Sequence, residues 1–164
     1  MLLQKPWSER KKAVLVIHLN PRYPGNLTYE HGTIDEGVNA VREVLATAYD
    51  RNYPIILDCS NRELVLPGRD DNRRVISVDN TLFYAAAHGI ERFILIGFNR
   101  VECVKTHAQT ILQKRKSFAT TDYLLFGNCD FDTEKEMAET LEYFRNNGTL
   151  YDDHRRLIEG ELSL

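Results

Sequence analysis

Short apolar runs alternate along the chain with longer segments in which apolar residues recur every three or four positions. Continuous apolar runs of strand length are typical of strands buried on both faces of a parallel sheet. The segments with a three-to-four-residue period are typical of amphipathic helices. The runs predict strands over 13–19, 55–57, 75–78, 93–96 and 123–126.

Helices are expected between most of these strands. The helical period and the flanking residues predict them over 35–51, 80–88, 101–115 and 133–144. Thr133 and Glu136 have the spacing of a capping box, which marks the start of the last helix. Residues 60–74 are polar and irregular and predict a surface loop, and residues 151–164 predict a mostly polar tail with a short helix.

Strands and helices in alternation favour right-handed crossovers and a parallel sheet with helices on both faces. We therefore expect a three-layer α/β/α fold of the Rossmann type, with a mostly parallel central sheet of about five to six strands. The 164 residues form a single domain in this interpretation. Its core spans about 10–147, and a polar C-terminal tail spans 148–164.

The residues at the carboxyl ends of the strands are the first candidates for a functional site. In open parallel sheets, ligands bind outside these ends. Here they are 18–20, 58–61, 97–103 and 128–130.

Composition narrows the kind of chemistry. The net charge is −3, and a nucleic-acid partner is not expected because phosphate binding needs a basic face. No apolar run is long enough to suggest a membrane partner. The cysteines are Cys59, Cys103 and Cys129; their odd number predicts reduced thiols and a cytoplasmic location.

Cofactor motifs are not found. The glycine-rich phosphate loops that bind dinucleotides or nucleoside triphosphates are missing from the sequence. No histidine has a structural zinc spacing to another ligand. We therefore expect neither a cofactor nor a protein-held metal.

Cys103 and His18 carry the most specific chemistry. Cys103 falls in the first turn of a helix that directly follows a buried strand, where main-chain N–H groups and the helix dipole favour a thiolate. His18 lies close to the end of the first strand, so it could act as the base of a Cys–His pair. Alternatively, Cys103 is a small buried apolar residue and His18 a half-buried histidine bonded to the main chain.

The stretch 89–104, with its glycine, apolar strand, second glycine and Cys103-Val104, resembles the isochorismatase-like cysteine hydrolases, which include the nicotinamidases. The run 14–20 is similar to the family's first strand, and the order of elements agrees over roughly residues 10–145. This resemblance implies a cysteine nucleophile, assisted by an aspartate at the end of the first strand and by a lysine before the fourth. It also implies a cis peptide bond shortly before the cysteine, which we expect at Asn99–Arg100.

Two members of that catalytic set differ here. Position 18 matches the family's aspartate but is a histidine, and no lysine lies between Lys12 and Lys105. Arg73 or Arg74 falls nearest the place of the lysine, but arginine stays protonated and cannot accept a proton. These two arginines either bind an anionic substrate group or belong to a solvated loop.

The resemblance leaves two hypotheses open. In the first, Cys103 and His18 hydrolyse a small amide, ester or related C–N or C–O bond, and Asn99, Arg100, Glu102, Arg73 and Arg74 form the substrate and oxyanion site. In the second, the altered site is inactive, because losing one member of a catalytic unit commonly removes most of the rate. The fold would then bind a small molecule or another protein, and relatives suggest a homo-oligomer.

Overall fold

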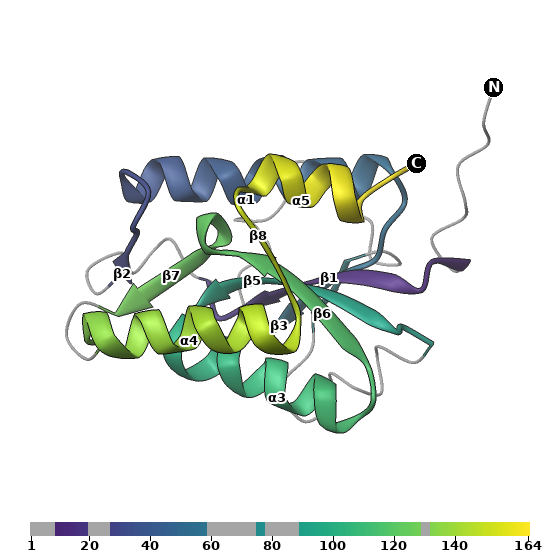
Figure 1. Ribbon diagram of the computed structural model, residues 1–164. Coiled ribbons are helices and arrows are strands. Elements are labelled where there is room, and N and C mark those ends of the chain that lie inside the picture. The colour runs from purple at the N-terminus through teal and green to yellow at the C-terminus, as the bar shows by residue number, and fades with distance from the viewer. Residues whose placement is uncertain (1–8, 20–26, 59–74, 78–88, 129–131) are drawn as a thin grey trace.

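The computed structural model describes residues 9–19, 27–58, 75–77, 89–128 and 132–164 (Figure 1). The expected helix over 80–88 and the loop over 60–74, including Arg73 and Arg74, lie outside these ranges. So do Cys59 and Cys129.

A mostly parallel sheet forms the middle layer. Among the described residues its strands run β2-β7-β5-β1-β3-β4, with β6 pairing with β5 and with β8. All pairings are parallel except β2 with β7. The strands are β1 (Lys12–Ile17), β2 (Leu27–Thr28), β3 (Ile55–Asp58), β4 (Val75–Ser77), β5 (Arg92–Phe98), β6 (Ser117–Thr121), β7 (Leu125–Asn128) and β8 (Thr149–Tyr151).

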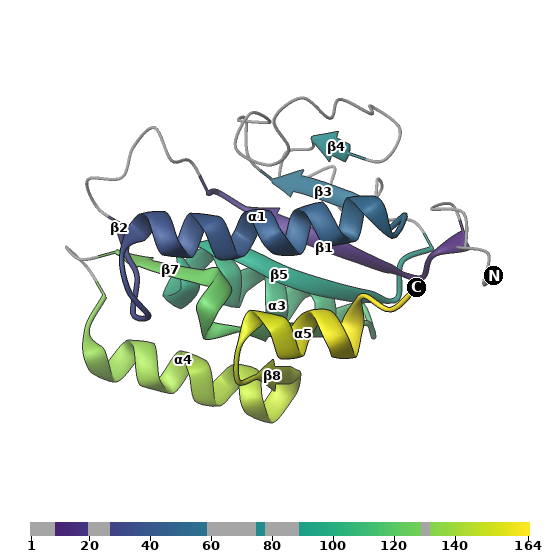
Figure 2. The ribbon, with the colours of Figure 1, turned by 90° about the horizontal axis from the view of Figure 1, so that it is seen from above.

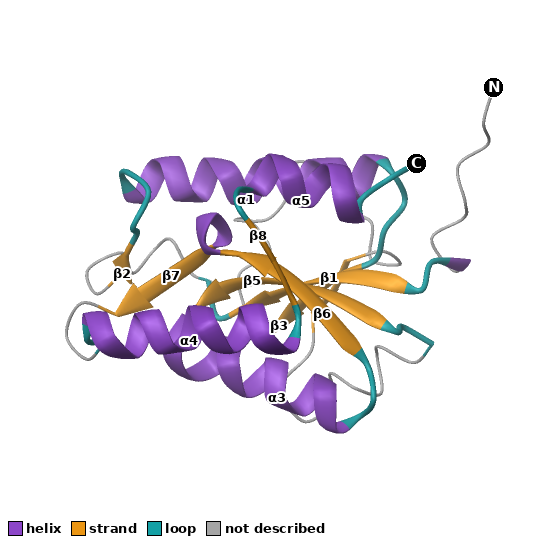
Figure 3. Cartoon of the chain, in the orientation of Figure 1, coloured by secondary structure: helices purple, strands orange, loops and turns teal. Residues whose placement is uncertain are grey.

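Helices cover both faces of this sheet. Helices α1 (Ile34–Asp50) and α5 (His154–Glu161) lie on one face, and α3 (Lys105–Gln113) and α4 (Glu134–Asn147) lie on the other (Figures 1 and 3). Seen from above, α1 runs along β1 and β3 (Figure 2). The expected three-layer α/β/α architecture is confirmed.

The central strand β1 has a side chain for each layer. Val14 and Val16 belong to the buried cluster beneath α1 and α5, whereas Leu15 and Ile17 belong to the cluster beneath α3 and α4. This explains the continuous apolar run, because alternate side chains of a strand point to opposite faces and both faces are buried here.

Three strands were not expected from the sequence, namely β2, β6 and β8. Strand β6 reads Ser-Phe-Ala-Thr-Thr, and its polar residues hide it from a search for apolar runs. Thr120 is nevertheless fully buried and donates a hydrogen bond to the carbonyl oxygen of Leu95, 2.8 Å away. The sheet therefore has eight described strands rather than five or six.

The ends of several elements differ from expectation. The strand expected over 123–126 is β7, which is displaced toward the C-terminus and preceded by the 3₁₀ turn η5 (Asp122–Leu124). The helix expected over 101–115 begins as the π-helical turn η4 (Arg100–Val104). The segment expected as a polar tail supplies β8 and α5, and it buries Leu157 and Leu162 completely.

The predicted start of the last helix is confirmed at α4, where Thr133 is the N-cap and its hydroxyl accepts a hydrogen bond from the Glu136 N–H at 3.1 Å. None of the helices in the described ranges has the length and apolar character needed to cross a bilayer.

Candidate active site at the carboxyl ends of the central strands

The sheet order brings the ends of three strands together. Strand β1 lies between β3 and β5, and Ile17 is in register with both Asp58 and Gly97. His18 is the next residue, and its main-chain N–H donates to the carbonyl oxygen of Asp58 at 3.0 Å. The chain turns out of the strand at His18, which has a positive φ of 47°.

Gly97 allows β5 to pass close to β1 at this edge. Its φ is +135°, and a β-carbon there would lie 2.0 Å from the carbonyl oxygen of Ile17. Only glycine fits both the backbone conformation and the space. The two strand ends that carry His18 and the segment leading to Cys103 are therefore held together by a main-chain contact.

Cys103 lies in η4, the turn that follows β5. Asn99 caps this turn, since its side-chain oxygen accepts a hydrogen bond from the Val101 N–H at 3.1 Å. Cys103 is a free, half-buried cysteine. Its sulfur is hydrogen-bonded by the His18 side chain and by the main chain of Asn99.

The charges at this edge favour a thiolate. The hydrogen bond from His18 lowers the pKa of Cys103 below its ordinary value, with the Asn99 main chain assisting, and this outweighs the opposing effect of burial. Hydrogen bonding to Asp58, and then to Cys103, raises the pKa of His18 to about 10. The expected neighbourhood of Cys103 and His18 is thus present, in a form suited to an imidazolium–thiolate pair.

Asp58 is the third member of the cluster. Its Oδ2 lies 3.5 Å from His18 Nε2 and 2.7 Å from Nε2 of His107, which projects from α3. Burial would raise the pKa of Asp58, but the hydrogen bonds from His107 and His18 outweigh it and hold the pKa at about 2. Asp58 is 4 % exposed, so a buried carboxylate stands behind the imidazole of His18.

The sequence predicts that Asp58 lies at a strand end but not that it contacts His18, and it assigns no role to His107. One signal was available for His107. It follows Cys103 by four positions in a continuing helical segment, and residues so spaced share a helix face.

Arg100, predicted as part of the substrate and oxyanion site, is buried and paired with two acidic side chains. It is 1 % exposed, and its guanidinium pairs with Asp122 and with Glu30. Asp122 also contacts His31 Nε2 at 2.8 Å. Arg100 therefore ties η4 to the segment before α1 and to η5.

The other predicted site residues have different surroundings. Asn99 is buried beside Cys103, where its amide donates to Asp132 at 3.3 Å, whereas Glu102 is exposed. The negative charge of Glu102 acts to raise the pKa of Cys103. The cis peptide bond is Phe98–Asn99, one residue before the expected position.

The described residues contain no group of three His, Cys, Asp or Glu side chains that could hold a metal ion. The cluster at this edge brings together a thiol, an imidazole and a carboxylate, from Cys103, His18 and Asp58.

Comparisons with known proteins identify the fold. No family model matches the sequence, and a search of curated proteins finds no match. Among solved structures, the MAR1 ribonuclease from Caenorhabditis elegans matches with a TM-score of 0.73 and 14 % identity, over 96 % of this chain and 83 % of that chain.

Two further structures carry family names. An isochorismatase family protein from Burkholderia thailandensis matches with a TM-score of 0.65 and 14 % identity, over 85 % of this chain and 90 % of that one. A cysteine hydrolase from Pseudomonas syringae pv. phaseolicola matches with a TM-score of 0.64 and 11 % identity, over 91 % of each chain. With these likenesses beside the arrangement of its sheet and helices, the chain has the isochorismatase-like hydrolase fold.

Proposed function

We propose that the chain is a hydrolase that uses Cys103 to attack the carbonyl carbon of a small amide or ester. His18 is its proton carrier, and Asp58 orients the imidazole. The observation that supports this proposal is the convergence of the three side chains from η4, from the residue after β1 and from β3 at one edge of the sheet.

The first half of the reaction uses the ion pair. The Cys103 thiolate forms a C–S bond to the carbonyl carbon, and the electron pair of the C=O bond moves to oxygen. As the tetrahedral intermediate collapses, the C–N or C–O bond breaks and the His18 imidazolium gives its proton to the leaving group. The products of this half are a thioester on Cys103, a neutral His18 and a released amine or alcohol.

The second half restores the site. The sulfur of the thioester has no negative charge. The pKa of His18 is therefore lower than in the free enzyme, because one of the interactions that raise it is lost. Neutral His18 can then accept a proton from water as the water oxygen attacks the thioester. The C–S bond then breaks with its electron pair returning to sulfur, and the carboxylic acid leaves. Cys103 is again a thiolate, and His18 holds the proton taken from water.

In this proposal, His18 and Asp58 together take the place of the aspartate and the lysine that the family uses. The family uses an aspartate at position 18 and a lysine, whereas this chain has His18 and no lysine in that region. A carboxylate hydrogen-bonded to a catalytic imidazole holds the ring in place and stabilises its charged form. The pair of His18 and Asp58 therefore offers one route to the same thiolate chemistry.

The reactivity of Cys103 tests the proposal directly. Iodoacetamide labelling is followed by mass spectrometry from pH 5 to 10, with Cys59 and Cys129 as references in the same chain. We expect Cys103 to react fastest at neutral pH, because its pKa is lowered. His18→Ala should shift its rate profile to higher pH, since it removes the largest cause of that lowering while burial remains.

His154→Ala is the matched control, because His154 pairs with Glu43 on the other side of the sheet, in α5. It should leave the labelling profile unchanged. An ordinary Cys103 profile that ignores His18→Ala would refute the proposal and favour the alternative, a catalytically inactive protein that binds a small molecule or another protein.

To find the substrate, we would measure the hydrolysis of a panel of small amides and esters. Cys103→Ala is the reference that should be inactive. A net charge of −3 disfavours RNA, although a ribonuclease is one of the structural neighbours. Labelled RNA is therefore included in the panel, and cleavage that needs Cys103 would contradict the proposed substrate class. A reduced thiol at Cys103 is consistent with the cytoplasmic location predicted from the sequence.

A further inference from the structure

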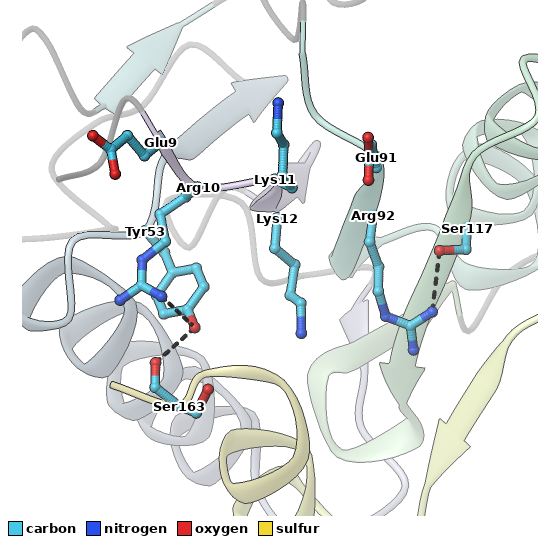
Figure 4. A pocket seen from close by; sticks show the side chains of 9 residues that line it. All are labelled: Glu9, Arg10, Lys11, Lys12, Tyr53, Glu91, Arg92, Ser117 and Ser163. Carbon is cyan, nitrogen blue, oxygen red and sulfur yellow. Dashed lines mark hydrogen bonds between the residues drawn. The ribbon is translucent and has the colours of Figure 1, made fainter. Parts of the chain in front are cut away.

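A cavity lies at the opposite edge of the sheet from Cys103, where β1, β5 and β6 begin. It has a volume of about 430 Å³, and Lys12, Arg92 and Ser117 are among the residues that line it (Figure 4). Lys12 is in register with Arg92, and Arg92 with Ser117. The three strand starts therefore place two cations and a hydroxyl in one row, at the edge of the sheet away from Cys103.

One carboxylate serves both cations of this row. Lys12 Nζ lies 2.7 Å from Glu161 Oε2, and Arg92 Nε lies 2.9 Å from Glu161 Oε1. Glu161 is 3 % exposed. Its ion pairs connect the end of α5 to the first residues of β1 and β5. Since a single negative charge faces two positive ones, this group keeps an excess positive charge.

Arg10 adds a third cation with neutral partners. Its guanidinium donates to the Tyr53 hydroxyl at 3.2 Å and to the carbonyl oxygen of Arg51 at 2.9 Å. Its carbon also lies 4.0 Å from the centre of the Tyr53 ring. Arg10 is only 9 % exposed, and among the described residues its buried Nε has no hydrogen-bond partner.

The arrangement of these side chains suits an anion. Figure 4 shows the head groups of Arg10, Lys12 and Arg92 on the same side of the chain, with Lys11 extending the other way. A guanidinium has five N–H donors, and Arg10 uses two of them in the contacts above.

Two acidic side chains also line the cavity, but both are at its exposed rim. Glu9 and Glu91 are exposed, whereas Arg10 is buried. Opposite charges interact weakly in water and more strongly where water is excluded. Glu9 and Glu91, which face water, therefore neutralise the buried cations only weakly. The inner part of the cavity keeps a positive charge.

We propose that this cavity binds a small molecule through an oxyanion group, either a carboxylate or a phosphate. Arg10 and Lys12 supply the charge, and the Ser117 hydroxyl is a hydrogen-bonding partner beside them. The volume is within the range of small-molecule sites. The inference is independent of the reaction proposed for Cys103, because the residues and the edge of the sheet are different.

Inorganic phosphate and succinate are the probes, each titrated separately into the ¹⁵N-labelled chain against sodium chloride of equal ionic strength. Saturable amide shifts should cluster at residues 9–12, 91–92 and 117. A response to phosphate alone or to succinate alone identifies the oxyanion. If neither probe exceeds the chloride control, or if the shifts lie instead around Cys103, the proposal is overturned.

Arg10→Gln should weaken the responding probe roughly tenfold or more, the usual effect of losing a hydrogen bond to a charged group. Lys135→Gln is the charge-matched control, since the Lys135 side chain is 85 % exposed on α4, and it should leave the affinity unchanged. Equal affinities for both variants would contradict the assignment. The titration of the parent chain decides the matter even if Arg10→Gln does not fold.

Discussion

Asp58→Asn is the most informative single change at the candidate site, because it removes the charge that two histidines share. The side chain keeps its size but can no longer hold a negative charge. The pKa of Asp58 is about 2 in the folded chain against an ordinary value of 3.8. A carboxyl with a lowered folded pKa stabilises the fold above its unfolded pKa, and that contribution is lost as pH falls from 3.8 toward about 2.

The size of the effect follows from that interval. At about 1.4 kcal/mol per pKa unit, the change from 3.8 to about 2 corresponds to roughly 2 kcal/mol of folding free energy at neutral pH. Asp58 is nearly inaccessible to solvent, so little of this is lost to screening. The amide that replaces it also turns the charged hydrogen bonds of both histidines into neutral ones, which are weaker.

Urea unfolding at pH 7, 5, 4 and 3 measures the prediction. The parent should exceed Asp58→Asn by at least about 2 kcal/mol at pH 7, and the gap should narrow as the pH falls below 4. Asp152→Asn, which changes an exposed carboxylate, is the control and should show a small gap at every pH. A gap for Asp58→Asn that does not vary with pH would refute the reasoning, because the loss would then come from packing and not from charge.

Three further variants examine the neighbouring contacts. Gly97→Ala should lower the unfolding free energy by about 3 kcal/mol or more, because its β-carbon would meet the main chain of β1; Gly89→Ala, with no atom within 4 Å of the added carbon, should lose only about 1 kcal/mol in the same urea assay. His107→Gln should raise the pKa of Asp58, followed by NMR titration, because the hydrogen bond from His107 is the largest of the contacts that lower that pKa; an unchanged pKa would contradict this contact. Arg100→Met should lower the free energy of unfolding by about 3 kcal/mol and leave the rate of Cys103 labelling within twofold of the parent. A large change in the labelling rate would show that Arg100 contributes to the reactivity of Cys103.

The layers of the fold could be predicted because its central strands are buried on both faces. Such strands leave continuous apolar runs, as β1 and β5 do. Strand β6 left no such signal, since Thr120 is buried by donating its hydroxyl to a neighbouring strand. Burial of that kind depends on a partner that the local sequence does not name.

The candidate site also contains residues that the sequence could predict and residues that it could not. Cys103 and His18 were predictable because both follow strands that end at one edge of a parallel sheet. The ion pairs of Arg100 were not predictable, since its partners Asp122 and Glu30 come from distant parts of the chain. Asp58 was identified by position alone, and only the pairing of β1 with β3 brings it to His18.

The proton shared by His18 and Cys103 has a consequence for stability. Between pH 6.5 and 9.0, the ordinary pKa values of the two groups, the unfolded chain carries this proton on the thiol. Where the folded pair is ionic, the folded chain carries it on the imidazole. Because both states bind the same number of protons, the pair gives stability no pH dependence in this range.

In Cys103→Ala, the free energy of unfolding should depend on pH in this range, because the thiol no longer supplies the compensating proton. His18 would still have a raised pKa through Asp58, and a raised pKa stabilises the fold below the unfolded value of 6.5 and ceases to do so as pH rises through the folded value. The variant should therefore lose stability relative to the parent from pH 6.5 to 9, as followed by urea unfolding in steps of half a pH unit. A parent-minus-variant difference that stays constant across this range would mean that no proton moves from Cys103 to His18 on folding, and the ion pair on which the proposed chemistry depends would be absent.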